Sequence, residues 1–328
     1  MRTLHRFVDT PIKLWLTVTT VLLFGLVLHE TIIGHWGAIA AAAREGALTR
    51  QPSGVLRDLR IAIVNCLLGG YLAGALFAVV RGGRRTVYQL QSALDCTDEE
   101  CAALAGSIRF TRGGLVAAGV AGLAFAFITP YLIPPVPENL WNPASWSPEV
   151  TWHRVLGPII SVLAFVLGYA ILSVSGRMSR LASQLGSIDL FDHRPLMPFT
   201  QQGLTNALLL IGLLSIYGLM LLMETGFGLV ALIVALVTLT GAALTLVLPL
   251  RGVHRRIEQA KAAELEWLDE ELSKRRATLK EGGSETSPGS FADLAAYRRE
   301  VRDVPEWPVN TSTWVRFALY SLIPVASW

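Results

Sequence analysis

The sequence predicts an all-α membrane protein: a polytopic bundle of six membrane-spanning helices, followed by a charged helical hairpin and a short apolar segment. Three observations support this class. Hydrophobic residues make up 52% of the 328 residues and charged residues only 16%, whereas about a quarter of a soluble domain is charged. Six apolar stretches approach the roughly 20 residues that cross a bilayer. Of the 53 charged residues, 23 lie within residues 251–310, which indicates a separate polar module.

The six apolar stretches set the domain boundaries. They run over Leu14–Ile33, Ile61–Val80, Leu115–Ile133, Val155–Val174, Leu204–Met223 and Gly226–Leu250. We therefore expect a transmembrane bundle over residues 1–250, a charged hairpin over 251–310 and a last apolar segment over 311–328. The basic start and first apolar run resemble a signal peptide, but the small residues Ala38–Ala40 lie about ten residues beyond the run, so we interpret it as an uncleaved helix.

Arginines at the ends of the spans predict the orientation. They gather in every second connection, at Arg81, Arg84, Arg85, Arg109, Arg112, Arg177, Arg180, Arg194, Arg251, Arg255 and Arg256. Cytoplasmic connections are the ones rich in basic residues. We therefore expect both termini in the cytoplasm of a bacterial inner membrane. The first outer connection is an exception, because it carries Arg44, Arg50, Arg57 and Arg60.

Small residues recur at every fourth position in two of the spans. The stripes are Ala62, Cys66, Gly70, Gly74 and Ala78 in the second span, and Gly114, Ala118, Gly122 and Ala126 in the third. Such stripes let helix backbones approach closely inside a bilayer. We expect the second and third spans to pack on each other, with a pore lining or a dimer face as alternatives.

The last span continues into a charged helix, which predicts a stalk that leaves the bilayer. Within VHRRIEQAKAAELEWLDEELSKRRATLK, the leucines at 265, 268, 272 and 279 have the a/d spacing of a coiled coil. GGSETSPGS then predicts a turn. Phe291, Leu294, Tyr297 and Val301 follow at helical spacing, so we expect the chain to return along the stalk as the second arm of a hairpin that ends at VPEWP.

Two connections on the stalk side carry further features. In the first, Gly82–Gly83 and Gly113–Gly114 are predicted hinges around two short helices, and Thr97 is a predicted N-cap. Its cysteines, Cys96 and Cys101, lack the second ligand pair of a zinc site. We expect both to be reduced, as cytoplasmic thiols are.

The second connection contains the sequence IDLFDHRPLMPF, in which charged side chains alternate with apolar ones. Buried charges require partners. We expect a buried ion cluster that joins this connection to the start of the stalk, either to fix the junction or to act as a gate or sensor. Its candidate members are Asp189, Asp192, Arg194, His254, Arg255 and Arg256.

The known sequence motifs of catalysis are missing. There is no P-loop, GxSxG, HExxH, paired CxxC or dinucleotide fingerprint. HETIIGH places His29, Glu30 and His35 together, but this spacing differs from the i, i+4 pair of zinc proteases. The sequence therefore predicts no enzyme, no cofactor and no metal. Because the basic residues sit at span ends and in a mixed-sign tail, it also predicts no nucleic-acid partner.

The closing segment, NTSTWVRFALYSLIPVASW, has a predicted cap at Thr311 or Ser312 and an apolar body. The residues from Thr313 onward reach about 24 Å as a helix, short of a full crossing of about 30 Å. We expect a re-entrant or tilted half-span; an incomplete seventh span is the alternative.

Two segments, IDLFDHRPLMPF and LPLRGVHRRIEQAK, resemble parts of bacterial multi-pass membrane proteins that have no assigned function. The resemblance covers the C-terminal half. It implies a multi-pass membrane fold and carries no catalytic or binding residue over to this chain.

Three functions were weighed on the sequence. The favoured one is a non-catalytic accessory, scaffold or signal-coupling subunit, whose hairpin binds a partner or a second copy through Leu265, Leu268 and Leu272. The alternatives are an oligomeric channel or transporter, and a membrane enzyme acting on a lipid-borne substrate through Asp189, Asp192 and His193. Few ionisable residues lie within the spans, which disfavours cation-coupled transport.

Overall fold

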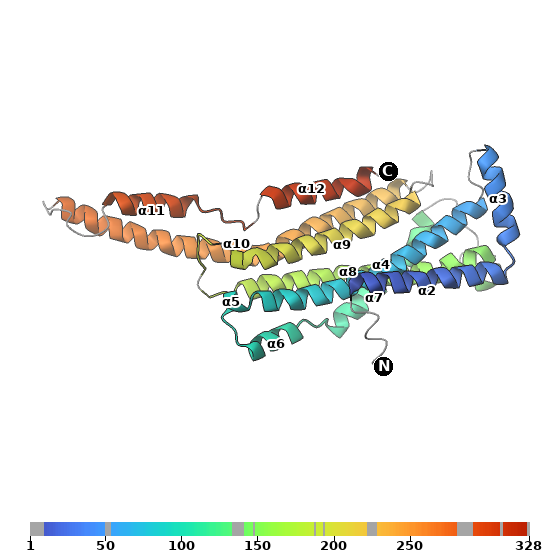
Figure 1. Ribbon diagram of the computed structural model, residues 1–328, viewed down its shortest axis with the longest axis horizontal. Helices are drawn as coiled ribbons and strands as arrows, with labels where there is room; N and C mark the ends of the chain where they lie inside the picture. The colour runs from blue at the N-terminus through green and yellow to red at the C-terminus, as the bar shows by residue number, and fades with distance from the viewer. Residues whose placement is uncertain are drawn as a thin grey trace.

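The computed structural model describes residues 10–49, 54–132, 141–146, 148–186, 188–192, 194–221, 228–280, 291–308 and 311–326. Within these ranges the regular secondary structure consists of helices and short 3-10 turns, without strands. The molecule is elongated, and most helices run along its long axis (Figure 1). One helix, α10, extends far beyond the others. Its last part, residues 251–280, is called the stalk below, and the two ends of the bundle are called the stalk end and the far end.

Six helices are long and apolar enough to cross a membrane, which confirms the predicted multi-pass bundle. They lie where the apolar stretches were predicted. Their bounds are α2 Pro11–Ile32, α4 Gly54–Gln89, α7 Arg112–Ile128, α8 Pro148–Ala182, α9 Met197–Leu221 and α10 Gly228–Lys280. A further helix, α3 (Trp36–Thr49), joins α2 to α4 at the far end and stands across the bundle axis (Figure 1).

Helices α4 and α8 are longer than their predicted spans. They contain 36 and 35 residues, and both continue beyond the expected ends at Val80 and Val174. The predicted hinge at Gly82–Gly83 is wrong, because both glycines lie inside α4. A Cβ atom on Gly82 would lie 3.0 Å from the Gln202 side chain, and one on Gly83 would lie 3.0 Å from Val174. These glycines therefore serve close packing instead of a bend.

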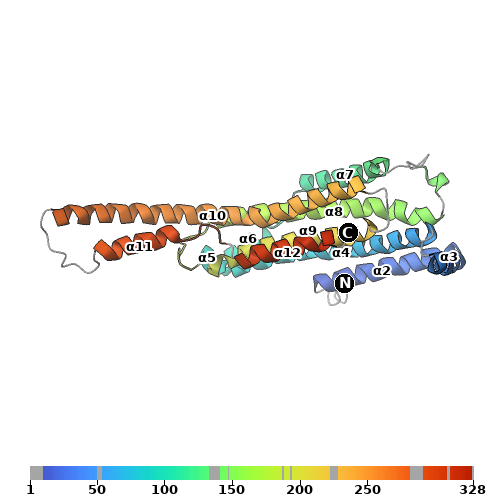
Figure 2. The same cartoon turned by 90° about the horizontal axis from the view of Figure 1, so that it is seen from above.

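The small-residue stripes pack on different helices from those predicted. A Cβ atom on Gly70 would meet Thr19 Oγ1 at 2.0 Å, and one on Gly122 would meet the Ser161 carbonyl oxygen at 2.7 Å. The stripe of α4 therefore receives α2, and the stripe of α7 receives α8. Seen from above, α2 and α7 lie on opposite sides of the bundle (Figure 2). The expected pairing of the second span with the third is thus wrong.

Short helices cover the stalk end. They are α5 (Gln91–Leu94), α6 (Asp98–Gly106) and the 3-10 turn Arg194–Leu196. The predicted cap at Thr97 is confirmed: its hydroxyl accepts from the Glu100 amide, and the Glu100 carboxylate accepts from the Thr97 amide. The hydrogen bonds that the Thr97 amide and hydroxyl donate to the Glu100 carboxylate lower the pKa of Glu100.

The cysteines of this region form a disulfide between Cys96 and Cys101, so the expectation of reduced thiols is wrong for this pair. The backbone turns through Asp95, which has a positive φ of 49°, and α6 then begins after the Thr97 cap. This turn brings the two Cα atoms to 5.9 Å, within the usual range for a disulfide. Cys66 is a buried free thiol in α4.

Two helices follow α10. Helix α11 (Phe291–Asp303) lies along the stalk, and α12 (Thr311–Ala326) lies along α9 (Figure 1). The Thr200 hydroxyl donates to the Pro308 carbonyl oxygen at 3.0 Å, which holds the segment between them at the start of α9. From there α12 runs away from the stalk toward the far end (Figure 1).

Candidate functional site at the base of the stalk

Helix α10 passes through the predicted junction without a break, although it contains Pro249. Near Pro249, two glycines allow the backbones of α9 and α8 to approach α10 closely. A Cβ atom on Gly203 of α9 would lie 3.0 Å from the Leu246 carbonyl oxygen, and one on Gly252 of α10 would lie 2.1 Å from the Ser179 carbonyl oxygen of α8. The stalk therefore starts from a point where three helix backbones are in near contact.

Arg256 joins the stalk to the chain that follows α8. Its Nε donates to the Leu185 carbonyl oxygen at 3.1 Å, and its Nη2 donates to the Gly186 carbonyl oxygen at 3.0 Å. Carbonyl groups beyond a helix C-terminus have no partner within the helix. The guanidinium supplies two donors and places positive charge at the negative end of the α8 dipole.

The segment after α11 is attached to the same part of the stalk. The His254 ring stacks on Trp307, with centroids 4.4 Å apart and an interplanar angle of 9°. His254 Nδ1 lies 3.1 Å from the Glu306 carbonyl oxygen. The Lys261 ammonium donates to the Val304 carbonyl oxygen at 3.0 Å and to Glu306 Oε1 at 3.3 Å. The segment after α11 therefore contacts the stalk at two positions, His254 and Lys261.

Two of the predicted a/d leucines, Leu265 and Leu268, pack in one apolar core with Val301 of α11. Leu268 is completely buried, as is Val301 of α11, whereas Leu265 and Leu272 are half-buried. On the same side Arg298 pairs with Asp269, with Nε 2.5 Å from Oδ1, and this contact lowers the pKa of Asp269. Lys261 contacts Val304 and Asp269 contacts Arg298, so α11 runs antiparallel to the stalk. Trp267, by contrast, keeps 52% of its surface exposed.

In the predicted ion cluster, Asp192 and Arg194 form one exposed pair, with Asp192 Oδ1 4.0 Å from Arg194 Nε, and the other members have different contacts. Asp189 accepts a hydrogen bond from the Phe191 amide, and Asp192 accepts one from the Arg194 amide. The Arg194 side chain is 91% exposed. Arg255 is exposed, and His254 and Arg256 are engaged as described above. The expected buried cluster is wrong, because the two aspartates each form a local turn with the backbone two residues ahead.

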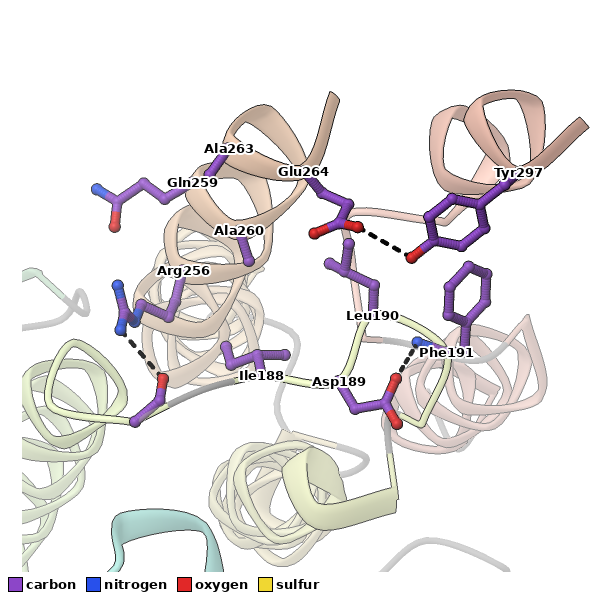
Figure 3. A pocket seen from close by; sticks show the side chains of 11 residues that line it. Ile188, Asp189, Leu190, Phe191, Arg256, Gln259, Ala260, Ala263, Glu264 and Tyr297 are labelled. Carbon is purple, nitrogen blue, oxygen red and sulfur yellow. Dashed lines mark hydrogen bonds between the residues drawn. The ribbon is translucent and has the colours of Figure 1, made fainter. Parts of the chain in front are cut away.

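A pocket of about 420 Å³ lies where three of these segments meet (Figure 3). The connection after α8, one face of the stalk and Tyr297 of α11 form its walls. The Tyr297 hydroxyl donates to Glu264 Oε1 at 3.1 Å. The Phe191 ring faces the Tyr297 ring, with centroids 6.0 Å apart. Two of the predicted site residues, Asp189 and Arg256, line this pocket.

Four buried polar residues beside the junction were missed by the sequence analysis. The Thr86 hydroxyl donates to Gln202 Oε1 at 3.1 Å, Gln202 Nε2 donates to Asn206 Oδ1 at 2.8 Å, and Asn206 Nδ2 donates to Ser175 Oγ at 3.1 Å. This chain joins α4, α9 and α8. Each residue is a single polar side chain in its own segment, so its burial and partners depend on the packing of distant helices. The i, i+4 spacing of Gln202 and Asn206 is the one sequence feature that could have indicated their contact, because side chains four positions apart are neighbours on a helix.

The HETIIGH segment forms a second polar cluster, at the far end. Glu30 is only 6% exposed. Its carboxylate oxygens lie 3.4 Å from His29 Nδ1 and 3.0 Å from His35 Nδ1. Among the described residues, no group of three or more His, Cys, Asp or Glu side chains is arranged to hold a metal ion. The cluster therefore consists of one carboxylate that contacts two imidazole rings.

Comparison with protein-family models, with curated proteins and with solved structures returns no match for this chain. Its function is therefore argued from the geometry above.

Proposed function

We propose that the chain is a non-catalytic subunit of the bacterial inner membrane that presents α11 and the stalk to the cytoplasm as a docking arm for a protein partner. Its role would be that of an accessory, scaffold or signal-coupling subunit. One observation carries the proposal: α10 is a single helix from Gly228 to Lys280, about 80 Å at 1.5 Å per residue. A helix of this length links the far end of the bundle rigidly to the tip of the stalk.

The cytoplasmic side is assigned from charge, which we weigh above the Cys96–Cys101 disulfide at the same end, a bond that is rare in cytoplasmic proteins. The stalk end carries Arg81, Arg84 and Arg85 of α4, Arg177 and Arg180 of α8, and Arg251 of α10, and basic residues of this kind remain in the cytoplasm. The N-terminal end of α2 and the start of α12 then face the same side. The direction of α12 supports a partial span that enters the bilayer beside α9.

The contacts of α11 change the expected binding face. Because Leu265 and Leu268 pack with residues of α11, a partner or a second copy would bind a different surface of the arm. Among the stalk residues whose side chains the structure describes, Trp267 is the large apolar one that remains exposed. Exposed tryptophans are frequent energetic centres of protein interfaces. We therefore place the partner contact on the side of the stalk that bears Trp267.

The test is purification of the full chain from native membranes in mild detergent. We expect a defined complex that is lost in Trp267→Ser and retained in Glu266→Ala, a matched change at the neighbouring exposed position. Leu268→Glu should also lose the complex, because it separates α11 from the stalk. A wild-type chain that purifies alone under these conditions would contradict the proposal.

The transport alternative receives less support from the buried polar residues. Thr86 lies beyond Arg81–Arg85 in the same helix, so the polar chain sits at the basic end of the bundle. Its hydrogen bonds satisfy each side chain, which favours a rigid junction over a path for ions. Measured flux of an ion or solute through vesicles that contain the purified chain would favour the transport alternative over the docking proposal.

A further inference from the structure

The pocket at the base of the stalk has the dimensions of a small-molecule site. Its volume of about 420 Å³ falls within the range of about 300–1,000 Å³ that is usual for such sites. Its walls come from three parts of the chain that are far apart in sequence: residues 186 and 188–191, five residues between 256 and 264, and Tyr297. A ligand here would touch the bundle connection, the stalk and α11 together.

The two ends of the pocket differ in chemistry. Between them lies an apolar strip formed by Ile188, Leu190, Ala260 and Ala263. At one end the Glu264 carboxylate lies beside the facing rings of Phe191 and Tyr297, with Asp189 on the adjoining loop (Figure 3). At the other end Arg256 is bound to the Leu185 and Gly186 carbonyl oxygens.

The aromatic end is electrically negative. Removal from water raises the pKa of Tyr297, and the nearby carboxylates of Glu264, Asp189 and Glu300 raise it further. Carboxylates attract a cation directly, and the faces of aromatic rings attract it through their quadrupoles. An ammonium group with an apolar substituent matches this end and the strip beside it.

We infer that this pocket binds a soluble organic monocation, an ammonium group on a short apolar body, with Glu264 and Asp189 as counter-ions and Phe191 and Tyr297 around the cationic group. This site is independent of the proposed partner contact at Trp267. Its occupant would hold α11 and the connection after α8 against the stalk.

Distance from the bilayer decides between two sources of the ammonium group. Glu264 follows Leu250, the last residue of the apolar span, by fourteen positions, or about 21 Å along the helix. The headgroup layer on each side of a bilayer is only about 5–8 Å deep. The ammonium group of a lipid headgroup does not reach Glu264, which leaves a soluble amine.

The test is calorimetric titration of the purified full chain in detergent with n-butylammonium and with choline, and butyrate as the matched anion. We expect saturable binding of at least one ammonium probe at millimolar concentration and none of butyrate. Glu264→Gln should weaken binding about tenfold or more, because it removes the counter-ion. Glu258→Gln, a change at an exposed position of the stalk outside the pocket, should leave it unchanged.

Two further measurements keep the result interpretable. Asp189→Asn preserves the oxygen that accepts from the Phe191 amide, so it should weaken binding while the loop keeps its fold. Vesicles of phosphatidylcholine or phosphatidylethanolamine should not compete with the soluble probe. Absence of saturable binding by both ammonium probes, equal binding of butyrate, or equal losses in Glu258→Gln and Glu264→Gln would each overturn the inference. Loss of the native complex in Trp267→Ser bears on the docking proposal alone.

Discussion

Arg256 of the stalk donates a hydrogen bond from Nη2 to the carbonyl oxygen of Gly186, 3.0 Å away and 70 positions earlier in the chain. The contact fixes the connection after α8 against the start of the stalk. It also sets one end of the pocket, which both residues line. A single side chain therefore links the position of the stalk to the shape of the candidate ligand site.

Replacing Arg256 by Gln should release this connection. A hydrogen bond from a charged donor contributes about 1.5–3 kcal/mol, and the variant loses the guanidinium bonds to both Leu185 and Gly186. We expect faster hydrogen exchange at residues 183–192 and a lower melting temperature. Arg255→Gln changes an exposed neighbour of the same type and should behave like the wild type. Equal exchange in the two variants would show that Arg256 does not hold the connection.

Gly252→Ala should disturb the contact between α10 and α8. The added Cβ atom would lie 2.1 Å from the Ser179 carbonyl oxygen, which is backbone and moves only if the helices separate. Overpacking of this kind costs about 1–3 kcal/mol. Gly176→Ala is the control, because a Cβ atom there has no neighbour within 4 Å. Thermal unfolding of both variants in one detergent measures the difference; a Gly252→Ala protein as stable as the control would refute the close contact.

Leu268→Glu should detach α11 from the stalk. Leu268 is completely buried, and an unpaired carboxylate cannot remain there without a large free-energy cost. We expect rapid proteolytic cleavage near residues 291–303 in the variant. Trp267→Glu places the same charge one position away on an exposed side chain and should leave cleavage slow. Similar cleavage of both variants would mean that the two positions are equally accessible.

The contact between α11 and the stalk should weaken in acid. The hydrogen bond from Arg298 holds the pKa of Asp269 below its ordinary value. A carboxylate with a lowered pKa in the folded state contributes stability above its unfolded pKa, and this contribution is lost as the pH falls through the folded value. Spin labels on α11 and the stalk should therefore report wider separation at low pH. Asp269→Asn should remove this part of the pH dependence; a variant with the wild-type profile would assign the effect to other groups.

Asn206→Leu should destabilise the junction of α4, α8 and α9. The change leaves Gln202 Nε2 and Ser175 Oγ, both buried, without the partner that Asn206 supplies. A buried polar group that loses its partner costs about 1–3 kcal/mol. Thr205→Val, at the exposed neighbouring position, should cost less. Chemical denaturation in mixed micelles compares the two, and equal stability would argue that water replaces the missing bonds.

Local features of the sequence were reliable guides to elements but poor guides to contacts. The Thr97 cap was predictable because its partner, Glu100, lies three positions away. The glycine stripes were recognised as packing surfaces, but the helix that fills each one was assigned wrongly. The aspartates at 189 and 192 looked like members of a cluster, yet each forms a turn with its own backbone. Charge alone does not specify whether a partner is near or distant.

The sequence by itself determined the class of the protein, the positions of the six apolar spans and the continuation of the sixth span into the stalk. It could do so because a bilayer demands about 20 consecutive apolar residues, a requirement that each segment meets on its own. Only the tertiary structure decided that two of the stalk leucines pack with α11, that Gln202 and Asn206 join three helices, and that Tyr297 closes a pocket with Glu264. These contacts join residues far apart in the chain, and such pairings depend on the shapes of both surfaces.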